Sequence, residues 1–460
     1  MEAFALNLLW VGPIVGALGS FFFSRRSLGK WVAFHAAVYG GLWGYLLLRY
    51  SGQGPFVELP WFRFGEKELY FALGLRPSNA ALVFLTYLVG FAALVYSLPY
   101  IQRPRFFAAL FFLAVAFCEG VFLAGDVFLF FVFYEASLVP AFLLIRGWGG
   151  VGRSGAAVRF ALFTLGGSVF LLVGLLWGFA EKGESRLALW QASVPGVGAW
   201  LLMTVGLAVK LPLFPLHNWL GEAHVEAETG VSMVLAGLFL KLGGYGLLEW
   251  VWYDMPEEWR YGLLGWGLLS LWYALGVAAG QSDLKRLIAF TSISHMAFVA
   301  LGAGSGSSMG MQGAYHQLFT HGIVSAGLFA WAGLLEKRRG SRSLAVLAGG
   351  LSRREKAAMV FLFFGAMGVP GLALFISEVF VLGGVGMGAG WGWSGLSAVS
   401  LPLTGLYFLR AYRQLSQSGE VPVVSSFSTG EVIVWGLIAL MVAAGVYPQP
   451  WLDLLAHVGH

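Results

Sequence analysis

The stretch that decides the fold is GLAVKLPLFPLHNWL, residues 206–220, where a lysine and two prolines interrupt a long apolar segment. Lys210 ends the apolar run, and Pro212 and Pro215 follow it. Proline lacks a backbone N–H and breaks the helical ladder. A bilayer tolerates such a break only where the freed backbone groups are buried or line a hydrated cavity. A charge beside a break therefore predicts a functional site within a membrane, and the alternative is a snorkelling lysine near the membrane surface.

The composition agrees with a membrane protein. Of the 460 residues, 58% are hydrophobic and 11% are charged, whereas soluble domains carry about 25% charged residues. The 19 Trp and 65 Gly fit rings at the headgroup level and close helix packing in lipid. The only cysteine, Cys118, excludes a disulfide framework, a Cys-ligated zinc site and an iron–sulfur cluster on this chain. The net charge of +5 indicates no nucleic-acid partner, because the basic residues lie in loops between apolar runs.

Apolar runs of roughly 20 residues, the length that crosses a bilayer, recur along the whole chain. We expect an all-α membrane protein that forms one integral membrane domain over residues 1–460, with its first span retained rather than cleaved as a signal. About fourteen transmembrane helices are expected from hydropathy. The expected spans are 3–22, 31–49, 78–98, 106–124, 127–145, 156–180, 197–224, 229–251, 260–280, 284–303, 308–335, 357–383, 387–409 and 429–447.

A second break resembles the first. In FFGAMGVPGLALFISEVFVL, residues 363–382, Pro370 and Gly371 interrupt the twelfth span. The broken spans, the seventh and the twelfth, are five apart, and an odd offset places two copies in opposite orientations. Matched broken helices indicate inverted repeats with the site at the breaks. We therefore predict two five-helix repeats, spans 4–8 over 106–251 and spans 9–13 over 260–409.

The polar segments predict the orientation. Residues 56–75 have strand-like composition around Gly65-Glu66-Lys67, which predicts a β-hairpin outside the bilayer. The basic stretch 336–356 is interpreted as a solvated cytoplasmic loop. Lys and Arg are concentrated in the loops after odd-numbered spans, which marks those loops as cytoplasmic. Both termini should then face the non-cytoplasmic side of the inner (plasma) membrane.

We single out five ionisable residues inside the expected spans: Glu119, Glu135, Lys210, Lys241 and Glu378. Each would cost about 2.5–3.5 kcal/mol at the bilayer centre even on the gentlest scale, so they must pair, face the bundle interior or touch water. A buried lysine whose proton affinity depends on its neighbours suits proton transfer. The alternative for Glu135 is a structural ion pair that locks two helices. Glu119 is either a second acidic relay or a residue at the membrane interface.

The histidines allow two interpretations. His295 and His321 fall in the middle of spans, where an imidazole can pass protons near neutral pH or simply hydrogen-bond two helices together. His316 lies five residues before His321 and faces elsewhere. His217 and His224 are seven residues apart and share a face, but no third ligand has fitting spacing, so no metal site is expected.

At the family level, the chain closely resembles the antiporter-like subunits of proton-pumping NADH:quinone oxidoreductase, complex I. The resemblance covers nearly the whole chain. It is carried by motifs in the expected order, which are FVFYEASLVP, AVKLPLFPLHNWL followed by GEAHVEAETGVSMVLAG, LFLKLGGYG, RLIAFTSISHMAF and VPGLALFISE. Two features favour the subunit M group, the counterpart of mitochondrial chain 4. Glu378 stands where the sister subunits usually carry lysine, and the chain stops soon after the fourteenth span.

The resemblance also implies roles, partners and alternatives. Glu135 would pair with Lys210 at an entry half-channel, and Lys241 would be the central switching residue. His295 and His321 would belong to a hydrated central axis, and Glu378 would release protons outward or to a neighbour. Redox chemistry would lie on other membrane-arm and peripheral subunits, sister antiporter-like subunits would be neighbours, and this chain would carry no cofactor. Subunits of Mrp-type sodium/proton antiporters and of membrane-bound hydrogenases resemble the same pattern and form the alternative.

Overall fold

The computed structural model describes residues 2–48, 56–192, 195–252, 255–417, 427–456 and 458. Helices make up most of this part of the chain, which confirms the predicted all-α class. Eleven of the described helices are long and apolar enough to cross a membrane. Of two shorter apolar helices, Val197–Lys210 lies within the expected seventh span, and Ala373–Gly388 begins in the expected twelfth span and ends just inside the thirteenth.

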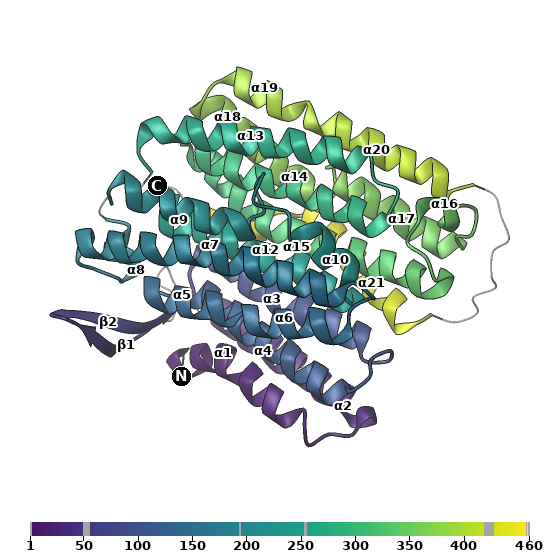
Figure 1. The fold of residues 1–460 in the computed structure, drawn as a ribbon, viewed down its shortest axis with the longest axis horizontal. Coiled ribbons are helices and arrows are strands. Elements are labelled where there is room, and N and C mark those ends of the chain that lie inside the picture. Colours follow the sequence, from purple (N-terminus) through teal and green to yellow (C-terminus); the bar gives the residue numbers. More distant parts are fainter. Residues whose placement is uncertain are drawn as a thin grey trace. The chain divides into compact units, whose positions relative to one another are not determined.

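The chain divides into two compact units, and Figure 1 labels most of their helices and strands. Unit 1 comprises Met1–Leu211, Glu226–Glu228 and Leu238–Glu257. Unit 2 comprises Pro212–Val225, Thr229–Gly237 and Glu258–His460. The main division therefore falls inside the proline break after Lys210, whereas the repeats were predicted to meet between residues 251 and 260. The single domain and the two inverted repeats stay predictions.

Unit 1 consists of helices and one β-hairpin. Its elements are α1 (Glu2–Gly19), α2 (Arg25–Leu48), β1 (Phe56–Phe64), β2 (Lys67–Gly74), α3 (Pro77–Ser97), α4 (Pro104–Leu123), α5 (Val127–Ala136), α6 (Leu138–Trp148), α7 (Arg153–Lys182), α8 (Leu187–Trp190), α9 (Val197–Lys210), α12 (Leu240–Gly246) and the π-helical segment η2 (Leu247–Val251).

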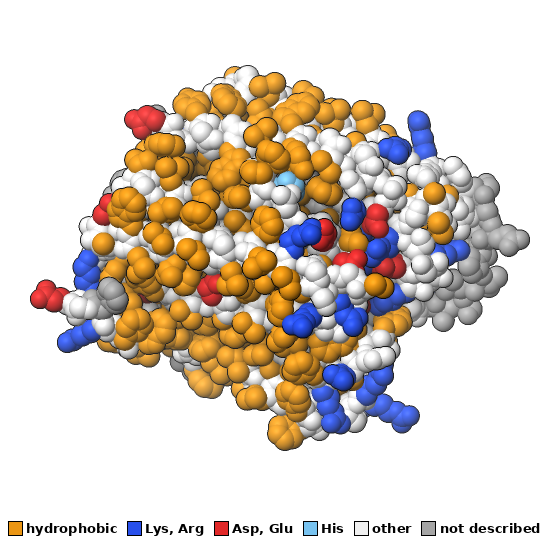
Figure 2. All heavy atoms as spheres, in the orientation of Figure 1, with side chains coloured by type: hydrophobic (Ala, Val, Ile, Leu, Met, Phe, Trp, Pro, Cys, Tyr) orange, Lys and Arg blue, Asp and Glu red, His pale blue; other side chains and the backbone are white. Residues whose placement is uncertain are grey.

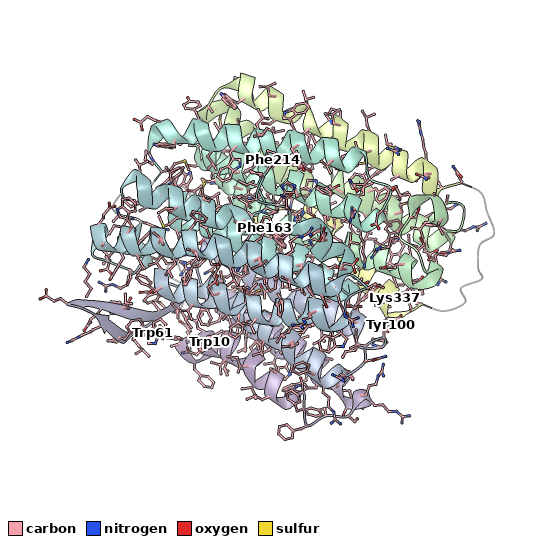
Figure 3. All side chains as sticks on the ribbon, viewed as in Figure 1. Trp10, Trp61, Tyr100, Phe163, Phe214 and Lys337 are labelled. Carbon is pink, nitrogen blue, oxygen red and sulfur yellow. The ribbon has the colours of Figure 1, made fainter. Side chains whose placement is uncertain are left out.

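The hairpin confirms the prediction for residues 56–75. Strands β1 and β2 pair antiparallel around Gly65, whose φ is 65°, and Trp61 lies on β1 (Figure 3). The Asp126 carboxylate ties the hairpin to α5, because it accepts hydrogen bonds from the Tyr70 N–H (3.2 Å) and from two N–H groups of the first turn of α5. Burial raises the pKa of Asp126, and these bonds partly offset that effect.

Among the described residues of unit 2, the regular elements are all helices. Its elements are α10 (Leu220–Glu226), which ends at the unit boundary, α11 (Thr229–Val234), α13 (Glu257–Ala279), α14 (Leu284–Gly304), α15 (Ser308–Arg339), α16 (Leu344–Leu347), α17 (Arg353–Ala366), α18 (Ala373–Gly388), α19 (Trp391–Ala398), α20 (Ser400–Leu415), α21 (Thr429–Val446) and α22 (Gln449–Leu455). Lys337 marks the basic end of α15, and Phe214 lies in the irregular segment before α10 (Figure 3).

Both predicted breaks are present. Helix α9 ends at Lys210 and α10 begins at Leu220, so the segment with Pro212 and Pro215 is not helical. Helix α17 ends at Ala366 and α18 begins at Ala373, with Pro370 and Gly371 between them. The prolines explain both gaps, because each removes a backbone donor from the helical ladder.

Three expected spans are less regular than the hydropathy suggested. The expected span 127–145 divides at Ser137, shortly before Pro140. The expected span 387–409 divides at Val399. The stretch Thr229–Val251 contains two π-helical segments, η1 (Leu235–Phe239) and η2. Wide π turns of this kind often lie at functional sites.

Large apolar side chains are exposed on the outer faces of long helices. On α7, Leu162 is 66% exposed and Val169 is 62% exposed, and Phe163 lies on the same helix (Figure 3). Figure 2 shows hydrophobic side chains spread over the drawn face of α7. A water-soluble protein rarely exposes many large apolar side chains together. The exposure on α7 therefore agrees with a helix that faces lipid or apolar neighbours.

Candidate functional site

Lys210 is held at the end of α9 by the neighbouring helix α5. Its side chain is buried (2% exposed). The Nζ atom donates to the Tyr134 carbonyl oxygen (2.7 Å) and to the Ser137 Oγ (3.4 Å). It also lies 3.3 Å from the centroid of the Tyr134 ring, close enough for a cation–π interaction. The last carbonyls of a helix lack intrahelical partners, and the end of α5 supplies such an acceptor to the lysine.

The expected pairing of Glu135 with Lys210 is not a direct contact. Although the two residues are described and lie in the same unit, they form no ion pair within 4.0 Å. The partly buried Glu135 carboxylate accepts a hydrogen bond from Ser168 on α7 instead. The pairing itself stays a prediction, since the partners that the Lys210 ammonium contacts are the Tyr134 carbonyl and ring.

Glu119 is completely buried on α4, next to Cys118. Tyr87 is its close neighbour, but the Tyr87 hydroxyl donates to the Leu9 carbonyl (2.8 Å). Neither carboxyl oxygen of Glu119 has a hydrogen-bond partner among the residues described. A carboxylate in such a place is costly unless it is protonated or hydrated, which favours the relay interpretation over a position at the membrane surface.

Lys241 is fully buried on α12, which packs against α9. The packing is close at Gly243, where an added Cβ would lie 2.5 Å from the Leu211 backbone nitrogen and 2.7 Å from the Leu207 carbonyl oxygen. Only glycine permits this approach. The sequence therefore brings the helix of Lys241 against the end of the helix of Lys210 within unit 1.

In unit 2, His295 on α14 binds the second helix break. Its Nε2 atom lies 2.9 Å from the Ala366 carbonyl oxygen and 4.0 Å from Glu378 Oε1. The partner of the Ala366 carbonyl in an unbroken helix would be the N–H of residue 370, and Pro370 has none. The His295 and His321 rings are 5.3 Å apart and nearly perpendicular. The structure thus brings three predicted residues, His295, His321 and Glu378, into one buried cluster.

Glu378 lies against Gly368, a glycine within the break, two residues after α17 ends. A Cβ on Gly368 would lie 1.9 Å from Glu378 Oε2, and the φ of Gly368 is 65°. Oε2 has no hydrogen-bond partner among the described groups. The carboxyl group thus has room only because residue 368 lacks a side chain.

Uncharged residues join this cluster, and the sequence-based survey missed them. Ser377 Oγ donates to Gln317 Oε1 (2.5 Å) and lies 3.2 Å from Thr320 Oγ1. Gln317 Nε2 donates to the His295 carbonyl oxygen (3.2 Å). Polar residues at helical spacing before His321 were the available signal, but a survey restricted to charges does not count them.

The other predicted histidines lie apart from these clusters within unit 2. His217 packs against Phe214 and Tyr273, and the ring of His224 stacks on Phe329 at 4.5 Å. His316 is buried on α15. Across the described residues, no three His, Cys, Asp or Glu side chains gather as a metal site would require.

A second omission is Glu249, an acid in the last turn of the expected span 229–251. It is buried and pairs with Arg76. The sequence-based survey of charges could have found it, because it lies inside an apolar span.

Comparisons with known proteins agree with these features. The family described as "NADH:quinone oxidoreductase/Mrp antiporter, TM" matches residues 124–404. NADH-quinone oxidoreductase subunit M of Rhodobacter capsulatus is 32% identical over 456 residues, which cover 93% of this chain and 88% of that protein. A chain of respiratory complex I from Thermus thermophilus with bound NADH is 28% identical and covers 100% of this chain and 98% of its own length, with a TM-score of 0.88. A chain of the Mrp complex from Dietzia sp. DQ12-45-1b shares the fold at 19% identity, with a TM-score of 0.86 and coverage of 100% and 97%.

Proposed function

Because the chain belongs to the family of NADH:quinone oxidoreductase and Mrp antiporter membrane subunits, we propose that it translocates protons in the membrane arm of an NADH:quinone oxidoreductase. It is a multi-pass membrane protein. The relatives named as subunit M or chain 4 of such oxidoreductases support this choice within the family. The neighbours would be the other membrane-arm subunits, including sister antiporter-like subunits.

In unit 1, the proposed carriers are Glu135, Lys210 and Lys241. The Tyr134 carbonyl and ring stabilise the ammonium form of Lys210, and a carboxylate at the next residue, Glu135, adds to this effect in the proposed cycle. Loading requires Glu135 to leave Ser168 and deliver a proton toward Nζ. Movement of Glu135 away from Lys210 weakens the hold on the ammonium, and the proton then passes toward Lys241 on the packed helix α12.

In unit 2, the proposed carriers are His295, His321 and Glu378. The Ala366 carbonyl can only accept a hydrogen bond, so Nε2 of His295 carries a proton, and Nδ1 is the nitrogen at which we propose that a second proton is gained or lost. Glu378 lies within reach of small side-chain movements. A proton that arrives at the imidazoles can thus be passed to the carboxylate, which releases it outward or to a neighbouring subunit.

The observation that carries the proposal is the burial of ionisable groups beside helix breaks. Lys210 and Glu378 are both 2% exposed, and Lys241 is fully buried. Inert packing would not need charges that cost several kcal/mol each, on the order of 2.5–3.5 by insertion scales. Proton transfer requires ionisable groups in such positions.

Two finer statements belong to the same proposal. We place the protein in the inner membrane with both termini on the non-cytoplasmic side, on the strength of the loop charges. We also propose that flavin, iron–sulfur and quinone chemistry occurs on other subunits, so that energy reaches this chain through contacts with its neighbours.

The test uses Lys210→Ala and Glu378→Ala in the assembled complex, with the exposed Lys30→Ala on α2 as the control. Proton translocation per NADH oxidised, measured in proteoliposomes, should fall at least several-fold in both variants and stay normal in the control. Near-normal translocation in both variants would remove the proposal.

The family description also names the Mrp antiporter, and the alternative function is that of a sodium/proton antiporter subunit outside a redox enzyme. Gentle detergent extraction separates the two possibilities. Co-purification with iron–sulfur subunits supports the oxidoreductase, and their absence together with sodium-dependent transport supports the antiporter.

A further inference from the structure

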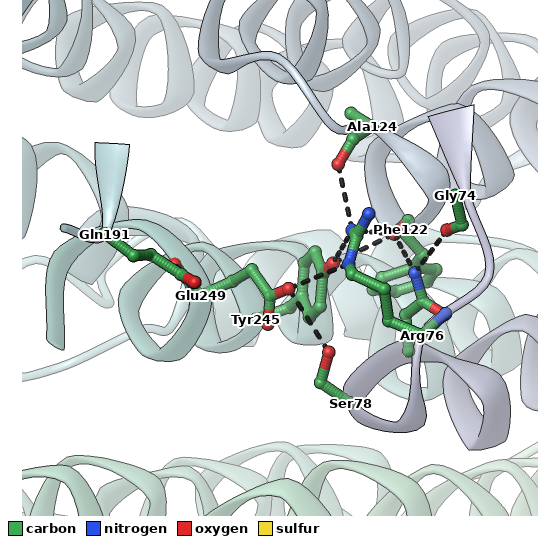
Figure 4. Close-up of polar contacts among 9 residues, drawn as sticks. Gly74, Arg76, Ser78, Phe122, Ala124, Gln191, Tyr245 and Glu249 are labelled. Carbon is green, nitrogen blue, oxygen red and sulfur yellow. Dashed lines mark hydrogen bonds and ion pairs between the residues drawn. The ribbon is translucent and has the colours of Figure 1, made fainter. Parts of the chain in front are cut away.

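A buried cluster of Arg76, Tyr245 and Glu249, here called the Arg76 cluster, takes no part in the proposed path (Figure 4). Arg76 lies directly before α3, and the other two residues lie on α12 and η2. The Arg76 and Glu249 side chains are 21% and 4% exposed. All three residues belong to unit 1.

The guanidinium group of Arg76 bridges two helices. Its Nε donates to Glu249 Oε1 at 3.0 Å. Its Nη2 lies within hydrogen-bond distance of three oxygens, which are the Phe122 carbonyl (3.2 Å), the Ala124 carbonyl (2.9 Å) and the Tyr245 hydroxyl (2.8 Å). The planar fork of arginine can hold several acceptors in a fixed arrangement, which a lysine cannot do.

One end of the cluster caps α4. The Phe122 carbonyl, in the last turn of that helix, also accepts hydrogen bonds from Asn79 Nδ2 (2.8 Å) and the Tyr245 hydroxyl (2.9 Å). The C-terminus of a helix carries partial negative charge, and a cation there is stabilising. Arg76 therefore fixes the end of the helix that carries Glu119.

The other end holds the segment that follows Lys241. Tyr245 is one helical turn after Lys241, and Glu249 is one turn further, inside η2. Ser78 Oγ donates to Glu249 Oε1 (3.2 Å), and Gln191 Nε2 donates to the Glu249 carbonyl oxygen (2.8 Å). A π-helical turn is rare, and these contacts fix it on several sides.

Stability alone does not account for such a pair. Replacing a buried ion pair by apolar side chains is often neutral or stabilising, so the charges point to a role in specifying one arrangement. The cluster ties the end of α4 to the segment after α12, and α4 and α12 also pack against each other.

We propose that the Arg76 cluster is a positioning device that sets the rotation of α12 and thereby fixes where Lys241 lies relative to Glu119 and Lys210 in unit 1. This inference rests on the proposed role of Lys241 in proton transfer. Arg76, Tyr245 and Glu249 are positioning residues and do not carry the proton themselves.

The balance of charge in the cluster gives the inference a distinctive signature. The charged or titratable groups on the unit 1 elements packed against α12 include Lys210 on α9, Cys118 and Glu119 on α4, and Tyr245 and Glu249 beyond Lys241 on its own helical stretch. In Arg76→Gln, the Glu249 carboxylate loses its counter-charge and favours the protonated form of Lys241. In Glu249→Gln, the Arg76 cation is left over and disfavours that form.

The experiment measures proton translocation per NADH oxidised, as a function of pH, in assembled complexes with Arg76→Gln, Glu249→Gln or both. Each single variant should lower translocation several-fold at neutral pH. The alkaline limb of the profile should move to higher pH in Arg76→Gln and to lower pH in Glu249→Gln, and it should return close to its original position in the double variant. The exposed pair Arg63 and Glu68 on the hairpin, 76% and 34% exposed, supplies the control variants Arg63→Gln and Glu68→Gln, which should change neither quantity.

Equal shifts in both single variants, or no shift, would overturn the inference, because a purely structural pair gives no opposite signs. If Arg76→Gln does not assemble, Glu249→Gln is compared with Tyr245→Phe. The first should lower translocation and shift the limb, and the second should lower translocation without a shift; any other pattern overturns the inference. Lys241→Met distinguishes a failure of this inference from a failure of the proposed function, since normal proton translocation in that variant contradicts the proposed function itself.

Discussion

The buried site of unit 1 is built around a lysine, and the buried site of unit 2 is built around a glutamate. Both sites place an ionisable side chain beside a helix end. In unit 1, the Lys210 ammonium donates to the Tyr134 carbonyl in the last turn of α5. In unit 2, His295 hydrogen-bonds to the Ala366 carbonyl at the end of α17, beside Glu378. Each acceptor lies at the end of a helix that stops before a proline. A broken helix thus supplies a fixed acceptor for a proton-bearing nitrogen in both units.

The difference lies in what surrounds that nitrogen. Lys210 is enclosed by a carbonyl, a hydroxyl and an aromatic face, all of which favour a cation. Glu378 lies beside an imidazole and in a space left by Gly368. The lysine site holds a charge, whereas the glutamate–histidine site can share one proton and be neutral as a whole. The helix breaks therefore supply the backbone acceptor in each site, and the side chains around it determine whether the site is positively charged or neutral.

The largest effect should come from filling the space beside Glu378. Gly368→Ala places a Cβ 1.9 Å from Oε2 and also adopts a left-handed conformation, which costs about 1–2 kcal/mol. We expect loss of most of the assembled complex or at least a tenfold loss of proton translocation. Gly340→Ala is the matched control, since its φ is also 65° but its surroundings are open. Equal damage from both variants would show that only the backbone strain matters.

The corresponding change in unit 1 should be smaller. Gly243→Ala forces α12 away from α9, because its Cβ would lie 2.5 Å from the Leu211 backbone nitrogen. Overpacking of this kind costs about 1–3 kcal/mol, which should lower the melting temperature and reduce proton translocation several-fold. Gly44→Ala on α2, in open space, should be neutral or slightly stabilising. If Gly243→Ala translocates protons normally, close contact between the two lysine helices is not required.

Removing the aromatic ring of Tyr134 should weaken the binding of the Lys210 ammonium in unit 1 and leave the site of unit 2 unchanged. In Tyr134→Leu, Lys210 keeps the carbonyl but loses a cation–π contact of about 0.5–2 kcal/mol. Proton translocation at alkaline pH should fall more than at neutral pH, because the ammonium is less well held. Tyr134→Phe keeps the ring and should behave like the unmodified protein. A large defect in Tyr134→Phe would instead assign the role to the hydroxyl group.

The smallest effect is expected at Glu184, outside both sites. Burial raises the pKa of its carboxyl group, but hydrogen bonds from Arg186 outweigh this, and the net pKa lies below its ordinary value of 4.5. A depressed folded-state pKa adds stability above pH 4.5, and this stability is lost as the pH falls through the folded value. Glu184→Gln should therefore lower the melting temperature slightly at pH 7 and have no effect at strongly acidic pH, as thermal unfolding can show. A pH-independent change would exclude this ion pair as the cause.

The sequence predicts much of the fold because lipid restricts the possibilities. The prolines at 212, 215 and 370 and the Gly65 turn each predict a local feature that the structure has. Of the about fourteen expected spans, the described residues show eleven helices that are long and apolar enough to cross a membrane. The interruption at Ser137 and the π-helical segments around Lys241 were not predicted. They depend on packing between helices, which leaves no periodic signal in a segment that is apolar on every side.

The sequence predicts which ionisable residues are buried, but it predicts their hydrogen-bond partners less well. Burial cost identifies Lys210, Lys241 and Glu378 from hydropathy alone, and the unit 2 histidines do lie beside Glu378. The pairing of Glu135 with Lys210 stays a prediction, because the acceptor that Lys210 contacts here is a backbone carbonyl. Every residue has a backbone carbonyl, so residue types do not show which carbonyl accepts a hydrogen bond. That is known only once the ends of the helices are located.

The central claim is most directly tested at Lys241, which has no alternative role as a surface charge because it is fully buried. The measurement is the number of protons translocated per NADH oxidised by proteoliposomes that contain the assembled complex with Lys241→Met. We predict a clear drop in this ratio while the amount of assembled complex is preserved. An unchanged ratio would mean that the buried charges of this chain are structural and that protons cross elsewhere.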